Sequence, residues 1–401
     1  LEQMDELSKE TVFIDGTKLE ACANKYTFVW KKSVGKWEEK MFLKIQEAVA
    51  LLNREYLQSF SVSKETRTHD IQKICCFIEQ VCEEQHTVFV HGRGKRKSRN
   101  QKYLDLFRRF LERQTVYDWH TASFQGRNNY CKTDPDATFM HMKDDHMRNA
   151  QLKPGYNVQI GVDSEYIVAA DIFQDRNDVW TLIPFLETIE KKVGFRYPSV
   201  TADSGYESEE AYTYLREQKQ KPYIKPQTYE KWKKRSFKQD ISKRENMGYD
   251  EITDTYICHA GKELKPLFIK KQKSKSGYES EVTVYECEDC TGCSYKERCT
   301  RAKGNKRLYI SKSFLEKRQE SYENILSEKG ILYRMNRSIQ VEGAFGVLKN
   351  DYEFQRFLLR GKTKVKLEIL LLCMGYNLNK LHAKIQNERT GSHLFPVKET
   401  A

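Results

Sequence analysis

The stretch YNVQIGVDSEYIVAADIF, residues 156–173, carries the clearest signal for the fold of this 401-residue chain. Its two arms, 156–162 and 166–173, are rich in the β-branched and aromatic residues that favour strands. The short polar triplet DSE lies between the arms, as in a tight turn that joins paired strands. The stretch therefore predicts a β-hairpin.

Strand and helix patterns on both sides of the hairpin predict an α/β fold. Upstream, TVFIDGTKLE at 11–20 has the composition of a strand around Asp15. Downstream, the pattern predicts a helix at 179–192, a strand at 198–202, a helix at 209–218 and a strand at 221–226. This alternation indicates an α/β sheet that carries two large insertions.

The two insertions differ in character. The first shows the apolar periodicity of charged helices at 37–60, 70–85 and 101–115, whereas the second is polar, basic and contains five of the eleven cysteines. A further helical region runs from 313 to about 387, with a break near 357–364. We therefore divide the chain into five parts. The core begins with a first strand (1–30), is interrupted by a helical insertion with a basic loop (31–130) and continues at 131–228. A basic, Cys-rich insertion (229–306) and a C-terminal helical part of the core (307–401) follow.

The composition indicates a globular protein with a polyanionic partner. Charged residues make up 31% and hydrophobic residues 39% of the chain, and the formal net charge is +12. Residues 92–102 hold six Lys or Arg and no acid, and residues 229–244 interleave basic and aromatic side chains. Such runs favour nucleic acid over a membrane surface, although each alone could be a solvated loop.

The sequence also bears on location. No apolar run approaches the roughly 18 residues of a membrane span, and the acidic, polar N-terminal stretch has no secretory signal. Eleven cysteines without an export signal indicate a reducing cytoplasm, where thiols serve as metal ligands or core residues rather than in disulfides.

Three acidic residues occupy apolar surroundings. Asp15 lies within a predicted strand, Asp203 follows another, and Glu342 borders the apolar stripe of a predicted helix at 337–354. A carboxylate in such a setting is costly unless it is paired, hydrogen-bonded or metal-bound. If the three converge, they form an oxygen-rich site suited to two Mg²⁺ or Mn²⁺ ions and to phosphoryl transfer. Unrelated capping or surface acids are the alternative.

Two glycines flank the acid of this last helix. Gly343 and Gly346 each cost a helix about 1 kcal/mol relative to alanine. We expect them to let the helix approach the sheet closely enough for Glu342 to face Asp15 and Asp203.

The second insertion contains a cysteine pattern typical of metal sites. Its last four cysteines follow the spacing C-x2-C-x2-C-x5-C, with a fifth upstream, and the set is Cys258, Cys287, Cys290, Cys293 and Cys299. Cysteine pairs two residues apart suit tetrahedral Zn²⁺, which takes four ligands, so one thiol is in excess. Such a zinc ion would fold a segment with too little apolar content for its own core. Free thiols and an iron–sulfur cluster are the alternatives.

A shorter polar run, HMKDDHMRN, also looks ligand-like, with His141, Asp144, Asp145 and His146. His141 and Asp145 could share one helix face, while His146 points elsewhere. Capping, DNA contact or plain solvation accounts for this run more simply than a metal site does.

Four long blocks of the chain resemble the DDE transposases of bacterial insertion sequences. They are VFIDGTKLEACANKYTFVW, DPDATFMHMKDDHMRNAQLKPGYNVQI, TADSGYESEEAYTYL and RSIQVEGAFGVLKNDYEFQRFLLRGKTKVKLEILLLCMGYNLNKL. The resemblance implies an RNase H-like mixed sheet flanked by helices, with a metal-binding triad at Asp15, Asp203 and Glu342. Two Mg²⁺ or Mn²⁺ ions would be the cofactor.

Further site residues follow from the same resemblance. Many relatives carry Tyr, Arg, Glu and Lys in one spaced signature around the last acid, which implies DNA contacts at Tyr333, Arg337 and Lys349. The gap between Glu342 and Lys349 matches that signature, whereas Tyr333 and Arg337 are each spaced one residue wider. Relatives usually carry a helical region before the first Asp that binds transposon ends. Only fourteen residues precede Asp15 (15 − 1 = 14), so we expect specific end recognition to be reduced.

The implied reaction is metal-dependent cleavage of transposon-end DNA, followed by attack of the freed 3′-hydroxyl on target DNA without a covalent enzyme intermediate. The implied partners are transposon ends, target DNA and at least a second copy of the chain in a synaptic complex, with no membrane. The expected location is the bacterial cytoplasm, in association with the nucleoid. The alternatives are an RNase H-like nuclease that only cuts and a transposase-derived DNA-binding protein without activity.

Overall fold

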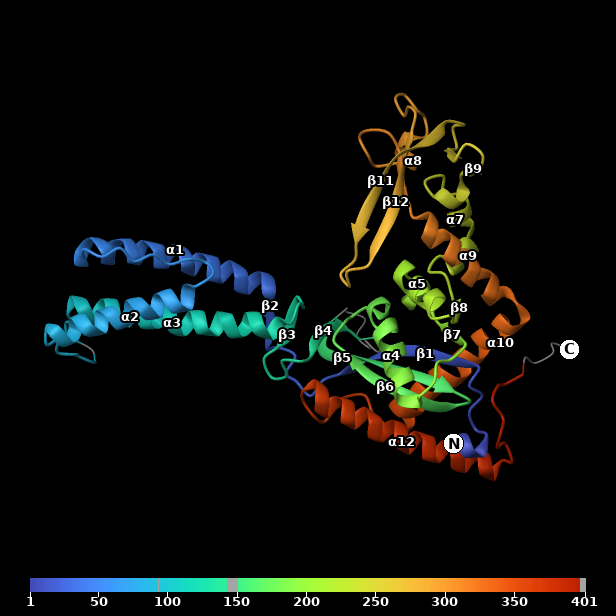
Figure 1. The fold of residues 1–401 in the computed structure, drawn as a ribbon, viewed down its shortest axis with the longest axis horizontal. Coiled ribbons are helices and arrows are strands. Elements are labelled where there is room, and N and C mark those ends of the chain that lie inside the picture. Colours follow the sequence, from blue (N-terminus) through green and yellow to red (C-terminus); the bar gives the residue numbers. More distant parts are fainter. Residues whose placement is uncertain (93, 143–150, 397–401) are drawn as a thin grey trace. The chain divides into compact units, whose positions relative to one another are not determined.

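The structure is a computed structural model that describes residues 1–92, 94–142 and 151–396 (Figure 1). The chain forms two compact units. We call the first the core unit, which comprises residues 1–19, 156–357 and 363–401. The second, the helical unit, comprises residues 20–155 and 358–362.

A six-stranded mixed sheet positions the site residues. Its order is β4-β5-β1-β7-β8, with β6 paired to β5. The strands are β1 (Thr11–Glu20), β4 (Thr138–His141), β5 (Leu152–Asp163), β6 (Tyr166–Phe173), β7 (Ser199–Ala202) and β8 (Lys221–Ile224). β1, β7 and β8 run parallel, whereas β4, β5 and β6 form antiparallel pairs. The predicted α/β class and the strands near 11–20, 198–202 and 221–226 are confirmed.

The predicted hairpin is also confirmed, and tertiary contacts support its tight turn. Asp163 pairs with Tyr166, so Ser164 and Glu165 form a two-residue turn, and both have positive φ. This conformation is unfavourable for residues other than glycine. The Glu165 N–H donates to Gln340 Oε1 at 2.8 Å, and its carboxylate pairs with Arg389 at 2.7 Å. The C-terminal helices thereby hold the turn.

Helices complete the core unit. The sheet packs with α4 (Leu182–Val193) and α5 (Glu209–Glu217) around one apolar cluster, which includes Val12, Ile14, Phe185 and Val200. Three further long helices are α9 (Lys312–Leu326), α10 (Glu328–Arg337) and α12 (Lys362–Gln386). The predicted break near 357–364 is confirmed, because no helix lies between Asp351 and Lys362.

The segment that carries Glu342 differs from the predicted regular helix. It consists of a π-helix η5 (Ser338–Glu342), one α-helical turn α11 (Gly343–Gly346) and a second π-helix η6 (Val347–Asp351). Wider π turns insert a residue into the helical repeat and occur frequently at functional sites.

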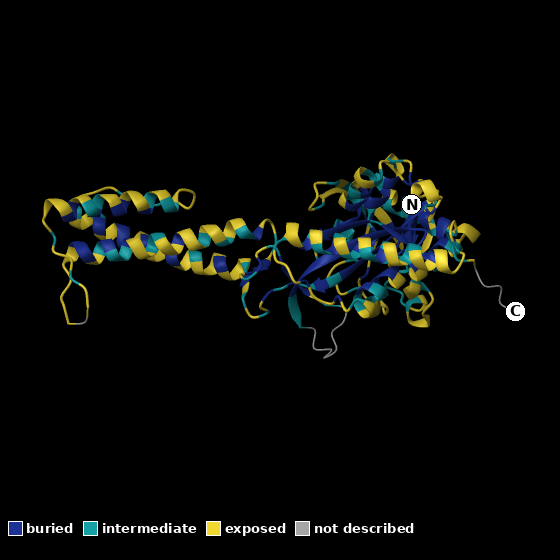
Figure 2. Ribbon diagram, turned by 90° about the horizontal axis from the view of Figure 1, so that it is seen from below, coloured by how far each residue is buried: buried dark blue, intermediate teal, exposed yellow. Residues whose placement is uncertain are grey.

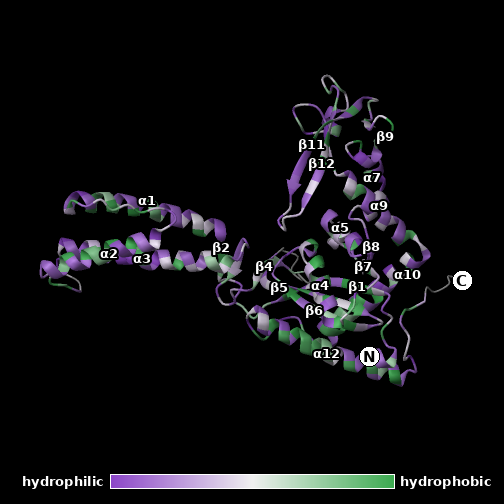
Figure 3. Ribbon diagram, in the orientation of Figure 1, coloured by the Kyte–Doolittle hydropathy of each residue, from purple (hydrophilic) through white to green (hydrophobic). Residues whose placement is uncertain are grey.

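Residues 248–310, which include the five cysteines of the predicted second insertion, form a separate antiparallel sheet in the order β13-β12-β11-β10-β9. The strands are β9 (Gly248–Asp250), β10 (Thr255–Ile257), β11 (Glu263–Lys273), β12 (Glu279–Cys287) and β13 (Arg307–Ile310). Figure 3 shows that β11 is mostly hydrophilic. The expectation that this segment lacks its own core is nevertheless wrong, because Tyr256, Leu264, Tyr285 and Leu308 pack into a small buried cluster. Apolar residues that alternate with charged ones build one buried face from a polar segment.

The helical unit contains α1 (Lys31–Tyr56), α2 (Arg67–Glu84) and α3 (Arg99–Phe124), which confirms the three predicted helices. Their inward faces share a core that includes Ile45, Leu52, Ile74 and Phe107. Figure 2 shows buried residues alternating with exposed ones along these helices. The short strand β2 (Phe28–Trp30) pairs antiparallel with β3 (Asn129–Cys131) at the base of the helices. No helix within the described residues is both long and apolar enough to span a bilayer.

Candidate active site

The first two predicted acids lie side by side, Asp15 within β1 and Asp203 directly after the end of β7. The parallel register of β1 and β7 pairs Ile14 with Ala202. Asp15 directly follows Ile14, and Asp203 directly follows Ala202. Adjacent strands are about 4.8 Å apart, which makes these two backbone positions direct neighbours. Asp15 is buried and Asp203 is half-buried. The register thus joins residues that are far apart in sequence.

Arg337 connects the third acid to the first. Its Nη1 lies 3.4 Å from Asp15 Oδ2, and its Nη2 donates to Glu342 Oε1 at 3.0 Å. The Arg337 side chain is 16% exposed, whereas that of Glu342 is 54% exposed. One guanidinium therefore bridges a buried carboxylate and a solvent-facing one, which brings Asp15 and Glu342 to the same place.

A buried tyrosine marks the centre of this acidic region. The pKa of Tyr206 is raised well above its usual value, first by burial and then by the negative charges of Asp178, Asp15 and Asp203. The positive charge of Arg337 acts in the opposite direction. Three carboxylates and one guanidinium therefore act electrostatically on the Tyr206 hydroxyl.

Asp178 was not predicted from the sequence, yet it lies within this cluster. Its Oδ1 accepts hydrogen bonds from Asn157 Nδ2 at 2.8 Å and from Gln159 Nε2 at 3.0 Å. Gln159 Oε1 in turn accepts a hydrogen bond from the Tyr206 hydroxyl. The signal that could have found this network is the pair of polar side chains on one face of an otherwise apolar strand, NVQ at 157–159.

Two local features hold the strand ends in place. Asp203 caps the short helical turn Ser204–Tyr206, where its Oδ1 accepts a hydrogen bond from Gly205 N at 2.7 Å. On the neighbouring strand, a Cβ at Gly16 would lie 2.1 Å from Gln159 Nε2. Glycine at position 16 is therefore what allows β1 to lie beside the buried Gln159.

The glycines that follow Glu342 have no such role. A Cβ at Gly343 or at Gly346 would meet no atom within 4 Å. The expectation that these glycines permit a close approach to the sheet is therefore wrong. The geometry that brings Glu342 to Asp15 comes from Arg337 and the π-helical turns instead.

The structure places the other predicted DNA contacts at different depths. Tyr333 is fully buried, and its hydroxyl donates to Glu10 Oε2 at 2.9 Å. Its ring packs edge-on against Phe13 and Tyr223, at centroid distances of 5.9 and 5.0 Å. Lys349 is half-buried on η6. Tyr333 thus faces the interior of the core unit, unlike Arg337.

The donor chemistry of the three acids fits a hard divalent cation. Asp15, Asp203 and Glu342 offer only carboxylate oxygens, which Mg²⁺ and Mn²⁺ prefer. Within residues 1–92, 94–142 and 151–396, however, no group of three or more His, Cys, Asp or Glu is arranged to hold a metal ion. Arg337 occupies the position between two of the candidate ligands.

The five cysteines of the second insertion line one small cavity, together with His259. They come from the end of β10, the end of β12 and the following turn, and the short helix α8 (Lys296–Cys299). Burial, a hydrogen bond with Cys290 and the nearby thiols raise the pKa of Cys287 to about 12. Of the run HMKDDHMRN, His141 is exposed at the end of β4 and pairs with Leu152 of β5, so it lies in a strand and not on the expected helix face. Asp144, Asp145 and His146 lie outside the described residues.

Comparison with known protein families identifies part of the chain. Residues 257–382 match the family model described as the transposase DDE domain, which confirms the resemblance to DDE transposases. The match covers about a third of the 401 residues and includes Glu342, Arg337 and most of the Cys-rich sheet, whereas Asp15 and Asp203 precede it. No curated protein and no solved structure matches the chain significantly.

Proposed function

We propose that this chain, whose residues 257–382 match the transposase DDE domain, cleaves transposon-end DNA and transfers the strand to target DNA through Asp15, Asp203 and Glu342. The observation that supports this most is the convergence of the three acids, through the β1–β7 register and through Arg337. An RNase H-like core is supported by the sheet, in which an antiparallel hairpin and two parallel strands flank β1.

The three acids would have different roles in metal binding. Asp15 and Asp203 would hold or bridge the two ions, and Glu342, the most exposed of the three, would complete the coordination where DNA arrives. When bound, two Mg²⁺ ions activate a water or hydroxyl and stabilise the leaving oxygen of a phosphodiester. The buried network of Asp178, Gln159 and Tyr206 would keep the two aspartates oriented.

Arg337 would exchange partners during this process. It now neutralises Asp15 and Glu342, and its buried Nη1 forms no hydrogen bond within the described residues. A divalent cation competes for the same carboxylates, which would release the guanidinium for a bidentate contact with a DNA phosphate. Lys349 would add a second phosphate contact. Tyr333, being buried, would position α10 and thereby Arg337.

Two alternatives share parts of this site. A nuclease that only cuts would use the same three acids. A transposase-derived DNA-binding protein would instead bind through the basic runs 92–102 and 229–244 and would not use the acids. The assay that separates them combines the protein with labelled DNA from the ends of its element, a target plasmid and Mg²⁺. Joined products support the transposase, nicks without joining favour the nuclease, and retention without cleavage favours the binder.

The matched control for this assay is Asp203→Asn, which keeps the shape of the side chain and removes a charge. We expect it to bind the DNA and to lose cleavage. Chemical crosslinking during the reaction tests for at least a dimer. Cleavage that survives in Asp203→Asn and in Glu342→Ala would contradict the site assignment.

For the second insertion we propose a structural zinc ion held by four of Cys258, Cys287, Cys290, Cys293 and Cys299. The support is that all five thiols line one cavity. Because they do not yet form a metal-holding group in the described structure, the metal would draw them closer.

Elemental analysis of the purified protein tests the zinc ion. We expect about one zinc per chain, reduced in Cys290→Ser and unchanged in Cys76→Ser, which alters an exposed cysteine on α2. Iron together with visible absorption would favour an iron–sulfur cluster. Five titratable thiols without any metal would favour free cysteines.

A further inference from the structure

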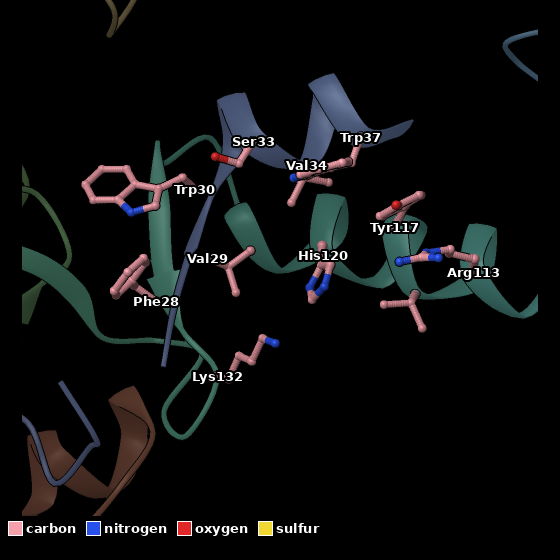
Figure 4. A pocket seen from close by; sticks show the side chains of 11 residues that line it. Phe28, Val29, Trp30, Ser33, Val34, Trp37, Arg113, Tyr117, His120 and Lys132 are labelled. Carbon is pink, nitrogen blue, oxygen red and sulfur yellow. The ribbon is translucent and has the colours of Figure 1, made fainter. Parts of the chain in front are cut away.

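An open pocket of about 540 Å³ lies in the helical unit, where β2 meets α1 and α3 (Figure 4). Phe28 and Trp30 border it from β2, Trp37 from α1, and Tyr117 from α3. Figure 4 shows the rings of Phe28 and Trp30 on the opposite side of β2 from Val29 and His120, so Trp37 and Tyr117 are the aromatic side chains on the side of the helices.

A second hollow of about 730 Å³ continues from the first along α1 and α3. The two share Trp37, Arg113 and Tyr117 in their linings, so we treat them as one surface, the α1–α3 groove. Because every lining residue belongs to the helical unit, the groove is complete within that unit.

The groove is basic as well as aromatic. Its lining contains five cations, Lys40, Lys44, Arg109, Arg113 and Lys132, against a single acid, Glu47. Nearby acids are engaged elsewhere: Glu38 pairs with Arg67 at 3.0 Å, and Glu55 pairs with Arg99 at 2.7 Å. Burial and the adjacent Lys132 lower the pKa of His120, so this imidazole lines the pocket in its neutral form at pH 7. The groove therefore favours an anion.

Its aromatic rings are unusually open to solvent. Trp37 is 59% exposed and Phe28 is 51% exposed. Lys40 lies over the Trp37 ring at 5.3 Å from its centroid. Contiguous exposed aromatic surface on a folded unit marks an interaction site, and interleaved cations indicate a ligand with both flat rings and negative charges.

We propose that the α1–α3 groove binds an unpaired stretch of DNA. Bases would stack on Trp37 and Tyr117 in the groove, while phosphates would contact Arg113, Arg109 and Lys132. A duplex hides the faces of its bases within the stack, so only an unpaired strand offers rings to this surface. The choice of DNA rests on the proposed function. The groove would hold a strand that has separated at a cleaved or opened end.

Binding measurements on the full chain test this inference. Fluorescence anisotropy of a labelled oligothymidylate of about twelve nucleotides, measured in EDTA so that nothing is cut, reports single-strand affinity. We expect Trp37→Ala to weaken that affinity about tenfold or more, as loss of one stacking platform does. The affinity for a duplex of equal length should change less than about threefold, because phosphate contacts remain.

Trp119→Ala is the matched control. Trp119 lies on α3, is 49% exposed and does not line the groove, so its loss should leave single-strand affinity unchanged. A second variant, Arg113→Gln, should weaken binding and reduce the salt dependence by about one phosphate contact. Circular dichroism verifies that each variant keeps its helices.

Two results would overturn the inference. One is unchanged single-strand binding in Trp37→Ala, and the other is an equal loss for single strand and duplex, which would indicate phosphate contacts only. The outcome is separable from the proposed function. If the protein never cleaves DNA but Trp37→Ala loses single-strand binding, the groove proposal stands and the transposase proposal is refuted. If cleavage is normal and Trp37→Ala binds single strands as before, the transposase proposal stands and the groove proposal is refuted.

Discussion

Arg337 sets the charge balance of the candidate active site. Its guanidinium touches both Asp15 and Glu342. Like charges repel unless a counter-charge or a metal lies between them. Arg337 supplies such a counter-charge, so under the proposed function a divalent cation would compete with it for the acids.

The first prediction concerns the variant Arg337→Gln. Without the guanidinium, the acids should bind Mn²⁺ about tenfold more tightly, whereas DNA cleavage should fall about 10²-fold because a charge-assisted phosphate contact is lost. Calorimetric titration measures the first effect, and the labelled-DNA assay measures the second. Arg334→Gln, on the same helix, is the control and should show neither change. Unaltered Mn²⁺ affinity in Arg337→Gln would refute the competition.

The second prediction concerns Gly16. A methyl group at this position would lie 2.1 Å from Gln159 Nε2, and Gln159 is held by Asp178 and Tyr206. Gly16→Ala should therefore destabilise the protein by about 1–3 kcal/mol through overpacking and should abolish cleavage. Thermal unfolding and the cleavage assay measure both effects. Gly35→Ala, where a Cβ meets no atom within 4 Å, should not destabilise the fold.

At the scale of elements, the segment 338–351 shows how far periodicity can guide a structural prediction. Its apolar spacing correctly indicated a helix, but the two π-helical turns around Gly343–Gly346 were not foreseen. A π turn depends on which side chains the sheet and the neighbouring helices accept, and this information lies outside the segment. The same holds for the Cys-rich sheet, in which β12 pairs with β13 across the intervening residues 288–306.

The third prediction uses Gly343 of that segment. Because a Cβ at Gly343 meets open space, Gly343→Ala should raise the unfolding free energy by as much as about 1 kcal/mol. Gly330→Ala is the contrasting variant, since its Cβ would lie 1.9 Å from the Asn324 carbonyl oxygen and should be strongly destabilising. Chemical denaturation measures both. A loss of stability in Gly343→Ala would restore the close-approach explanation.

At the scale of the whole molecule, a buried ion pair joins the two ends of the core unit. Lys384 Nζ on α12 lies 3.0 Å from Glu6 Oε2, and both side chains are almost completely buried. Tyr166 also donates to Glu6, at 2.8 Å, and Lys384 donates to the carbonyl oxygens of Ser164 and Ser392. This network fastens the first residues and the last helix to the hairpin β5–β6.

The fourth prediction follows from that pair. Lys384→Met leaves a buried carboxylate without its partner and should lower the unfolding free energy by about 3–5 kcal/mol. The double variant Lys384→Met/Glu6→Gln removes both charges and should regain a large part of the loss. Lys380→Met, which affects a partly exposed lysine on the same helix, is the control and should cost less. Equal losses in the single and double variants would show that the charge is not the cause.

The sequence by itself determined the local elements and the reactive groups. The strand at 11–20, the hairpin at 156–173 and the helices of both units follow from side-chain periodicity, which is a local property. The acids and thiols were recognised because such groups are costly in apolar surroundings or have ligand spacing.

Only the tertiary structure decided which of these groups meet. Asp15 and Asp203 are neighbours because a parallel register joins two strands 188 residues apart (203 − 15 = 188), and no local pattern encodes a register. Asp178 and Arg337 belong to the site for the same reason, since each reaches it from a different element. The α1–α3 groove likewise exists only once β2, α1 and α3 are assembled. Local chemistry selects the candidates, and long-range packing selects their partners.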